Sequence, residues 1–353
     1  MNILIVKLSS IGDIVHALPA VAAVRRAMPG AYISWVAEAR SAEILRGEAK
    51  LDDGTRLIDE LIEIDTRSMR GGKVIDEIVL ELGRQAKLLR TRDYDVAVDM
   101  QGLIKSAAAM RISGASRRFG FAKDALREPA SRFLLTDTVA VEPKIHVIEK
   151  NIRLAAAAFG FNAADVKIEF PIATSDEHVA EADAITEKAG ERFGLLNPAG
   201  GWVTKLWHAE KFGELATRIH TELGITPVVV TAPNESELAA KVRANTGDDT
   251  IFAEPSLKGF YEIAKRAAVY VGGDTGPTHL AVAANSPVVG IFGPTEWWRN
   301  GSPHEDDICV ERNDIGCRVD CHRRSCSNWI CMDIDVATVF DAVKLRLEKA
   351  SIA

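Results

Sequence analysis

The sequence lacks the features of several protein classes. No run approaches the roughly 20 uninterrupted apolar residues of a membrane-spanning helix, and the N-terminus shows no signal-peptide architecture. Basic residues are not in excess, because 43 Lys and Arg stand against 50 Asp and Glu, which gives a net charge of −7. This balance argues against a general nucleic-acid-binding protein. We expect a soluble globular protein of the cytoplasm, with peripheral membrane contact left open.

Cysteine is absent from the first 308 residues, and all five cysteines lie between Cys309 and Cys331. Four of them follow the spacing C-x3-C-x4-C-x4-C, at Cys317, Cys321, Cys326 and Cys331. This spacing lacks the C-x2-C pair of common zinc modules, and disulfides are unusual in the cytosol. Ordinary loop packing is the simplest interpretation. A structural metal site, a redox-sensitive loop and an interaction surface around Trp329 remain alternatives.

Two common nucleotide-binding motifs are also missing. No G-x-G-x-x-G follows the first strand, and no G-x-x-x-x-G-K-[ST] occurs, so a dinucleotide fold of the NAD type and a P-loop both lose their main support.

What the chain does contain is a regular alternation of strand and helix patterns. Its 353 residues favour two domains, and the alternation predicts βαβ units with largely parallel sheets in each. The predicted strands are 3–6, 32–36, 61–64, 95–99, 118–121, 133–141, 193–197, 227–230, 268–271 and 288–291; the predicted helices are 14–28, 74–89, 102–110, 145–159, 209–223, 235–245, 257–266, 277–284 and 336–347. We place the domains at 1–165 and 166–335, followed by a C-terminal helix at 336–353.

The loop after strand 268–271 has phosphate-compatible chemistry. Its glycines lead into Asp274, Thr275 and Gly276, and Pro277 suits the first turn of a helix. Free backbone N–H groups at such a helix start favour a pyrophosphate, and His279 lies one turn later. Asp274 or Thr275 would otherwise simply cap the helix.

Two further loops of the second half agree with a nucleotide diphosphate site. Gly200 and Gly201 follow one strand and allow close approach to a phosphate, and Lys205 supplies a positive charge. Glu235 follows the next strand, where a carboxylate commonly holds ribose hydroxyls. Glu235 also suits the first turn of its own helix.

In the first half, polar residues gather where strands are expected to end. Asp13 follows the first strand in a Ser- and Gly-containing turn, and Asp99, Gln101 and Lys105 follow another. Asp13 has the chemistry of a general base and equally that of a helix cap. His16 is better explained by packing than by catalysis. Cations at Arg67, Arg70, Lys105 and Arg127 would suit an anionic acceptor.

The chain resembles glycosyltransferase family 9, the ADP-heptose:lipopolysaccharide heptosyltransferases. The resemblance rests on LIVKLSSIGDIVHALPA near the start, VDMQGLIKSA at 98–107, REPAS at 127–131, GGDTGPTHLA at 272–281 and GIFGPT at 290–295. These motifs span nearly the whole chain, and the first three are most similar to heptosyltransferase I, which adds the first heptose to Kdo.

This resemblance implies a GT-B fold, in which two Rossmann-like domains face each other across a central cleft and the C-terminal helix crosses back to the first domain. It implies an inverting, metal-independent transfer of heptose from ADP-heptose to a Kdo hydroxyl of the lipopolysaccharide inner core, with no cofactor. Asp13 would be the general base. The implied partners are ADP-heptose and Kdo-lipid A at the inner membrane.

The resemblance also assigns binding residues. Those implied for the donor are Ser10, Gly12, Lys205, Glu235, Asp274, Thr275, Gly276 and His279, with Gly200 and Gly201 contributing backbone contacts; those implied for the acceptor are Arg67, Gln101, Lys105 and Arg127.

The cysteine-rich segment departs from typical heptosyltransferase I sequences and is more similar to heptosyltransferases II and III. A later core heptose or another nucleotide sugar is therefore the alternative within the family. Outside it, a nucleotide-sugar epimerase of GT-B type and a non-catalytic nucleotide-sugar binder remain possible.

Overall fold

The computed structural model describes residues 1–65, 83–319 and 321–352. The chain divides into two compact units, Met1–Ala173 and Thr174–Ala353, and each is described by itself. The division falls a few residues after the predicted domain boundary, within the polar region before the second run of strands.

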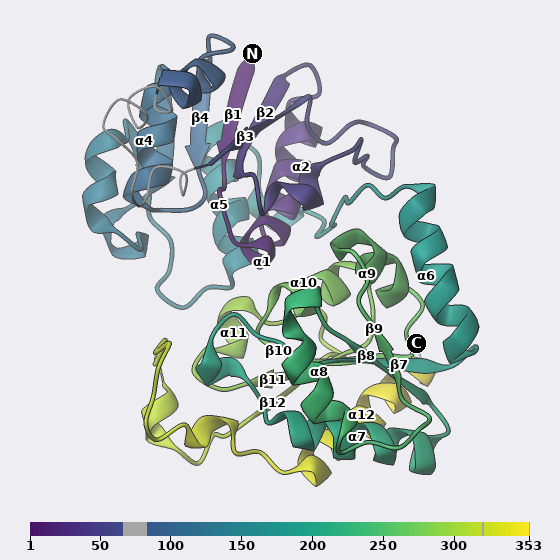
Figure 1. Ribbon diagram of the computed structural model, residues 1–353. Helices are drawn as coiled ribbons and strands as arrows, with labels where there is room; N and C mark the ends of the chain where they lie inside the picture. The colour runs from purple at the N-terminus through teal and green to yellow at the C-terminus, as the bar shows by residue number, and fades with distance from the viewer. Residues whose placement is uncertain (66–82, 320, 353) are drawn as a thin grey trace. The chain divides into compact units, whose positions relative to one another are not determined.

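The first unit is an α/β layer structure (Figure 1). Its strands are β1 (Asn2–Val6), β2 (Tyr32–Glu38), β3 (Glu60–Ile64), β4 (Val96–Asp99), β5 (Arg117–Phe121) and β6 (Asp137–Val139), and its helices include α1 (Ile11–Val15), α2 (Leu18–Ala27), α4 (Ile104–Ile112) and α5 (Val147–Phe159). Within the described residues the strands pair in parallel in the order β3-β2-β1-β4-β5-β6. This order is that of a doubly wound Rossmann fold.

The second unit repeats the arrangement. Its strands are β7 (Phe193–Asn197), β8 (Thr226–Val230), β9 (Ile251–Ala253), β10 (Val269–Gly273), β11 (Val288–Phe292) and β12 (Ile308–Glu311); its helices include α6 (Asp176–Ala189), α7 (Ala209–Leu223), α8 (Ser236–Arg243), α9 (Leu257–Ala264), α10 (Gly276–Ala283), α11 (Trp297–Asn300) and α12 (Val336–Ile352). The parallel order β12-β11-β10-β7-β8-β9 is the same Rossmann order in the second half of the chain.

The first predicted helix is interrupted. The sequence predicts one helix through 14–28, but α1 ends at Val15 and α2 begins at Leu18. Pro19 lies in the first turn of α2, where its missing N–H group leaves the chain unable to continue the ladder of hydrogen bonds from α1.

Two other predictions differ in extent. The predicted strand at 133–141 is reduced to Asp137–Val139, because Pro129–Leu134 forms a 3-10 helix that begins at its proline. Of the predicted helix at 74–89, residues 83–89 are helical, and the remainder lies outside the described residues. The short strands β9 and β12 were not predicted.

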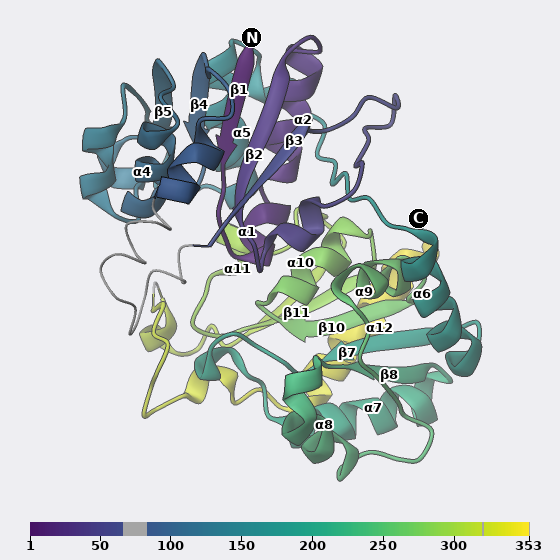
Figure 2. The ribbon, with the colours of Figure 1, turned by 45° about the horizontal axis from the view of Figure 1, so that its top comes forward.

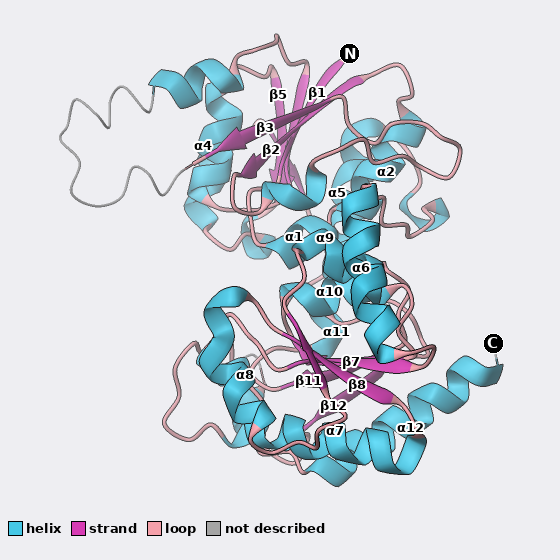
Figure 3. Ribbon diagram, turned by 45° about the vertical axis from the view of Figure 1, so that its right-hand side comes forward, coloured by secondary structure: helices cyan, strands magenta, loops and turns pink. Residues whose placement is uncertain are grey.

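Helix α12 packs on the second unit. Val339, Phe340 and Val343 are fully buried in the core that the second sheet shares with α7, and α7 and α12 run along the same face of that sheet (Figure 3). These residues of α12 belong to the second core, and the crossing of the helix back to the first domain, which the resemblance implies, stays a prediction. The apolar face of α12 that these residues form is buried in the core of the second unit.

Each unit has its own hydrophobic core. In the first, Leu4, Val6 and Val36 pack with Ala97 and with Met110 of α4, and Figure 2 shows β1, β2 and β4, the strands that carry the other four, within the first unit. None of the helices in the described part of the chain is long and apolar enough to cross a membrane.

Candidate active site

Both units place their polar loops at the point where the strand order reverses. In the first unit β1 pairs with β4, and in the second β7 pairs with β10. After two such neighbouring strands the polypeptide continues toward opposite faces of the sheet. Ligands bind in the crevice that this leaves outside the carboxyl ends of the strands. Asp99 ends β4, and Asp13, Lys205 and Asp274 lie in the segments that follow β1, β7 and β10. The sequence-predicted residues therefore lie at the two switch points.

Asp13 lies in the first turn of α1, directly after β1. Its Oδ2 accepts hydrogen bonds from the Ser10 backbone N–H at 2.9 Å and from the Ser10 hydroxyl at 3.2 Å. Its Oδ1 lies 3.5 Å from Lys7 Nζ, and the Asp13 side chain is 35 % exposed. Asp13 thus stabilises the start of α1 and still reaches solvent. Gly12 is buried beside it.

A buried polar network supports this turn from β4. Lys7 is 3 % exposed and donates to the Met100 carbonyl at 2.7 Å. Gln101 Oε1 accepts the backbone N–H groups of Leu8 and Ser9, at 3.0 and 3.2 Å. The predicted acceptor residue Gln101 therefore fixes the backbone of the turn that carries Asp13.

Asp99 is buried beneath the same turn. Its carboxylate accepts the backbone N–H groups of Gln101 and Gly102 and the Ser106 hydroxyl. Burial raises the pKa of Asp99 to about 6, although those hydrogen bonds and the charge of Lys7 act to lower it. These contacts hold the backbone after β4 and the Ser106 side chain of α4, so Asp99 shapes the loop after β4.

The other predicted acceptor residues lie around the loop after β4. Lys105 Nζ pairs with Oε1 of the buried Glu38 at 3.0 Å. Gly102 has a φ of +72°, and a side chain there would lie 3.7 Å from the backbone nitrogen of the exposed Arg127, so the 127–131 segment approaches this turn closely. Arg67 and Arg70 lie outside the described residues. His16 is buried, as packing predicts.

In the second unit, Lys205 and Asp274 form a buried ion pair. Lys205 Nζ lies 2.5 Å from Asp274 Oδ2 and 3.2 Å from the Asp274 carbonyl oxygen. His279 Nε2 lies 3.2 Å from Asp274 Oδ1, which also accepts from Asn300 Nδ2 at 2.6 Å. Burial acts to raise the pKa of Asp274, but the hydrogen bond from His279 and the charge of Lys205 hold that pKa well below its usual range.

The ion pair stands at the N-terminus of α10. Thr275 is the N-cap residue with extended backbone, followed by Gly276 and Pro277 in the first turn. Gly200 lies close to this point, since a Cβ there would be 3.7 Å from the Thr275 methyl group, whereas Gly201 is exposed. Backbone N–H groups at a helix start, together with an ammonium group, favour a phosphate.

Glu235 makes a local contact. Its Oε2 accepts the backbone N–H of Ala232 at 2.8 Å, and the side chain is half-buried. The carboxylate thus caps the short 3-10 helix Pro233–Glu235 after β8.

Sequence reasoning missed three residues that contact this site. Asn300, at the end of α11, holds Asp274. The ring of Trp202 lies under Lys205 Nζ at 4.3 Å and under the Arg324 guanidinium at 5.1 Å. Trp202 could have been found from its place between Gly201 and Lys205. Nothing in the sequence joins Asn300 or Arg324 to the loop after β7.

The cysteine-rich segment packs beside the same loop. Cys317, Cys321, Cys326 and Cys331 are free thiols, and all four line one pocket. Burial raises the pKa of the Cys331 thiol, and the neighbouring thiols of Cys321 and Cys317 raise it further. Within the described residues, no three His, Cys, Asp or Glu side chains surround a point where a metal ion could be held.

The chain is similar to known glycosyltransferases in sequence. A family model described as glycosyltransferase family 9 (heptosyltransferase) matches residues 82–329. Lipopolysaccharide heptosyltransferase 1 of Pseudomonas aeruginosa is 28% identical over 327 residues, 93% of this chain and 88% of that protein. Lipopolysaccharide heptosyltransferase 1 of Escherichia coli K12 is 27% identical over 297 residues, which cover 84% of this chain and 89% of that protein.

Solved structures share the fold. Escherichia coli heptosyltransferase WaaC with ADP superposes with a TM-score of 0.77 at 24% identity, covering 98% of this chain and 100% of that one. A family 9 glycosyltransferase from Veillonella parvula gives a TM-score of 0.80 at 18% identity, with 99% and 97% covered. The prediction of two Rossmann-like domains of the GT-B type is confirmed.

Proposed function

The chain belongs to glycosyltransferase family 9, and from that premise we propose that it transfers heptose from ADP-heptose to a Kdo hydroxyl of the lipopolysaccharide inner core. Relatives named lipopolysaccharide heptosyltransferase 1 support heptosyl transfer to lipopolysaccharide, and the structure of Escherichia coli WaaC with ADP-2-deoxy-2-fluoro heptose supports the donor. Such an acceptor is a lipid, so the proposal includes a cytoplasmic enzyme in peripheral contact with the inner membrane.

The observation that carries the proposal is the ammonium of Lys205 at the N-terminus of α10. Two of its three N–H groups are taken by Asp274, which leaves the third to donate to a diphosphate. As the bond between the anomeric carbon and the diphosphate breaks, negative charge develops on the departing ADP. A fixed cation and the free N–H groups of a helix start stabilise that charge without reorganisation.

Asp13 is the proposed general base. The acceptor hydroxyl attacks the anomeric carbon from the side opposite ADP, its proton passes to the Asp13 carboxylate, and the configuration at that carbon inverts. The geometry that suits this role is local: Ser10 fixes one carboxylate oxygen and Lys7 lies beside the other. A base whose orientation is fixed before the substrate binds loses little freedom in the reaction. Lys105 and Arg127 are the proposed contacts of the anionic acceptor, with Gln101 supporting the turn.

The test is a defined transfer reaction. Purified protein is incubated with ADP-heptose and either Kdo-lipid A or a Kdo-lipid A that already carries one heptose, and products are identified by mass spectrometry. Addition of one heptose to Kdo-lipid A is expected. Transfer to the heptosylated acceptor alone would contradict the acceptor assignment and favour a later step of the core. Consumption of the donor without any acceptor product would contradict the transferase proposal.

A further inference from the structure

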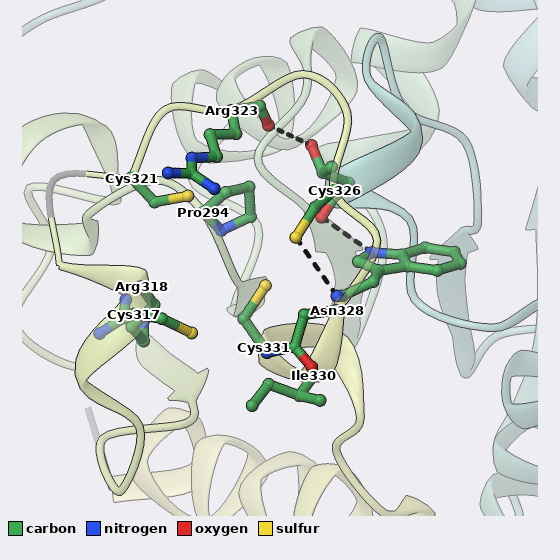
Figure 4. A pocket seen from close by; sticks show the side chains of 11 residues that line it. Pro294, Cys317, Arg318, Cys321, Arg323, Cys326, Asn328, Ile330 and Cys331 are labelled. Atoms are coloured by element: carbon green, nitrogen blue, oxygen red, sulfur yellow. Dashed lines mark hydrogen bonds between the residues drawn. The ribbon is translucent and has the colours of Figure 1, made fainter.

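Four cysteine side chains converge on one pocket. It has a volume of about 110 Å³ and lies between the loop after β7 and the cysteine-rich segment. Figure 4 shows the sulfur atoms of Cys317, Cys321, Cys326 and Cys331 turned toward the same space, from different parts of the segment. They come from positions spread over fifteen residues of sequence, so the fold, and not adjacency in the chain, brings them together.

The other residues that line the pocket do not explain why four thiols face one cavity. Arg318, which also lines it, is fully engaged: it donates to the Gly293 carbonyl at 3.2 Å and pairs with Glu311 at 2.5 Å. Among the other lining residues, the Trp329 backbone N–H donates to Cys326 Sγ at 3.4 Å, and the side chains of Pro294 and Ile330 offer the sulfurs no hydrogen-bonding partner.

We propose that Cys317, Cys321, Cys326 and Cys331 bind one thiophilic metal ion in a tetrahedral tetrathiolate site. Zinc and iron both form such sites, and four sulfur ligands select them over magnesium or calcium. On binding, the metal forms four bonds to sulfur and each thiol loses its proton to solvent. Within the described residues no three of these sulfurs yet surround one point where an ion could be held, so closure around an ion requires rotation of the cysteine side chains, of which those of Cys317 and Cys326 are exposed.

The site joins the cysteine-rich segment to the loop that carries Lys205. Trp329 Nε1 donates to the Thr204 carbonyl at 3.1 Å, and the Thr204 hydroxyl donates to the Arg323 carbonyl at 2.7 Å. Arg324 lies over Trp202 in the same loop. The metal therefore has a structural role, in which it fixes the segment against which the donor loop rests. This last role depends on the proposed function, whereas metal binding itself does not.

The GIFGPT motif at 290–295 also borders the pocket, through Pro294. The backbone N–H of His322 donates to the Pro294 carbonyl at 3.0 Å. At Gly293, an added Cβ would lie 3.2 Å from Cys331 Sγ and 2.3 Å from Met332 Sδ. The backbone of the motif at Gly293 thus lies against the side chains of Cys331 and Met332, at one wall of the thiol cavity.

The first experiment measures metal in the full-length protein, purified under reducing conditions without a metal-affinity step. About one zinc or iron per chain is expected by elemental analysis, and a visible absorption spectrum distinguishes ferric iron from colourless zinc. Cys321→Ser and Cys331→Ser should each lower the metal content at least tenfold. Cys309→Ser is the matched control, because Cys309 lies in β12 and does not line the pocket; its metal content should stay at the wild-type level.

The second experiment does not require the variants to fold. Wild-type protein is stripped of metal and titrated with Co²⁺, and sulfur-to-cobalt charge-transfer absorption saturating at one equivalent is expected. Absence of that absorption in a protein that also purifies without metal would overturn the proposal. So would disulfides between these cysteines in freshly isolated protein, or iron accompanied by acid-labile sulfide. ADP affinity is measured separately, so a metal site without donor binding would count against the proposed function alone.

Discussion

At the scale of single residues, Asp13 combines two tasks that can be separated. Its Oδ2 holds the Ser10 backbone and hydroxyl at the start of α1, while Oδ1 lies beside Lys7. An amide side chain can keep the first set of contacts and cannot take a proton. Replacements of Asp13 and Ser10 therefore distinguish a helix cap from a base.

Asp13→Asn should lower kcat by about 10²-fold or more, because loss of a general base removes a factor of that order, while donor affinity stays nearly unchanged. Steady-state kinetics and calorimetry with ADP-heptose measure the two. Ser10→Ala is the matched control, since it removes a cap contact and keeps the carboxylate. Similar losses of kcat in both variants would mean that Asp13 acts through the shape of the turn.

Lys205→Ala should raise the KM for the donor about tenfold or more, because a hydrogen bond to a charged group contributes roughly 1.5–3 kcal/mol. The control is Lys188→Ala, which removes an exposed lysine near the end of α6 in the same unit. Initial rates at varied ADP-heptose measure the effect, and an unchanged KM would remove Lys205 from the diphosphate site.

Asp99 gives a pH dependence of stability. Its folded-state pKa of about 6 lies above the reference value of 3.8, so the folded state binds this proton more tightly than the unfolded state. The stabilisation is complete below about pH 4 and is lost as pH rises through 6. Asp99→Asn does not titrate, so its free energy of unfolding relative to wild type should rise by about 2 to 3 kcal/mol between pH 4 and 7. Urea denaturation at several pH values measures this, and a constant difference would contradict the assignment.

At the scale of secondary-structure elements, α12 is part of the second core. Phe340 is fully buried there, and the Arg218 guanidinium lies 4.0 Å above its ring. The helix therefore contributes to the stability of the unit that carries Lys205 and Asp274.

Phe340→Ala should destabilise the protein by about 3–5 kcal/mol, the usual cost of removing a buried aromatic ring. Leu345→Ala, at a half-exposed position of the same helix, should change stability by less than about 0.5 kcal/mol. Chemical denaturation followed by fluorescence compares them. Equal effects of the two replacements would argue that α12 packs loosely.

The elements themselves were largely predictable because their signals are local. Buried strands such as β7 and amphipathic helices such as α7 match their predicted bounds, since hydrophobic periodicity alone defines them. The interruption before Pro19 and the shortening of β6 depend on backbone hydrogen bonding that periodicity does not report. The site was predictable where a residue follows its own strand, as Lys205 and Asp274 do. Asn300 depends on a tertiary contact and was missed.

At the scale of the whole molecule, the two sheets have the same strand order and carry different chemistry at their switch points. The first offers a carboxylate at the surface, and the second offers a paired ammonium at a helix N-terminus. The proposed reaction uses these protein charges, so it requires no metal ion at the reacting groups.

Activity should therefore persist in an excess of EDTA added at the start of the assay, with at least half of the initial rate retained. Elemental analysis of the same sample shows whether any metal bound by the four cysteines is still present. Complete loss of activity, restored by Mg²⁺ or Mn²⁺, would contradict a metal-independent transfer.

The separate cores of the two units have a consequence for how such an enzyme diversifies. A cluster of buried apolar residues in the first unit lies within residues 4–115, and one in the second unit lies within residues 196–343. A substitution that reshapes one core leaves the packing of the other untouched, since distant sites contribute additively. Descendants of a common ancestor could thus acquire new acceptors through the first half while inheriting the same donor chemistry in the second. Natural or laboratory recombination near residue 173 would exchange one whole half of the chain, and with it either the acceptor specificity or the donor chemistry.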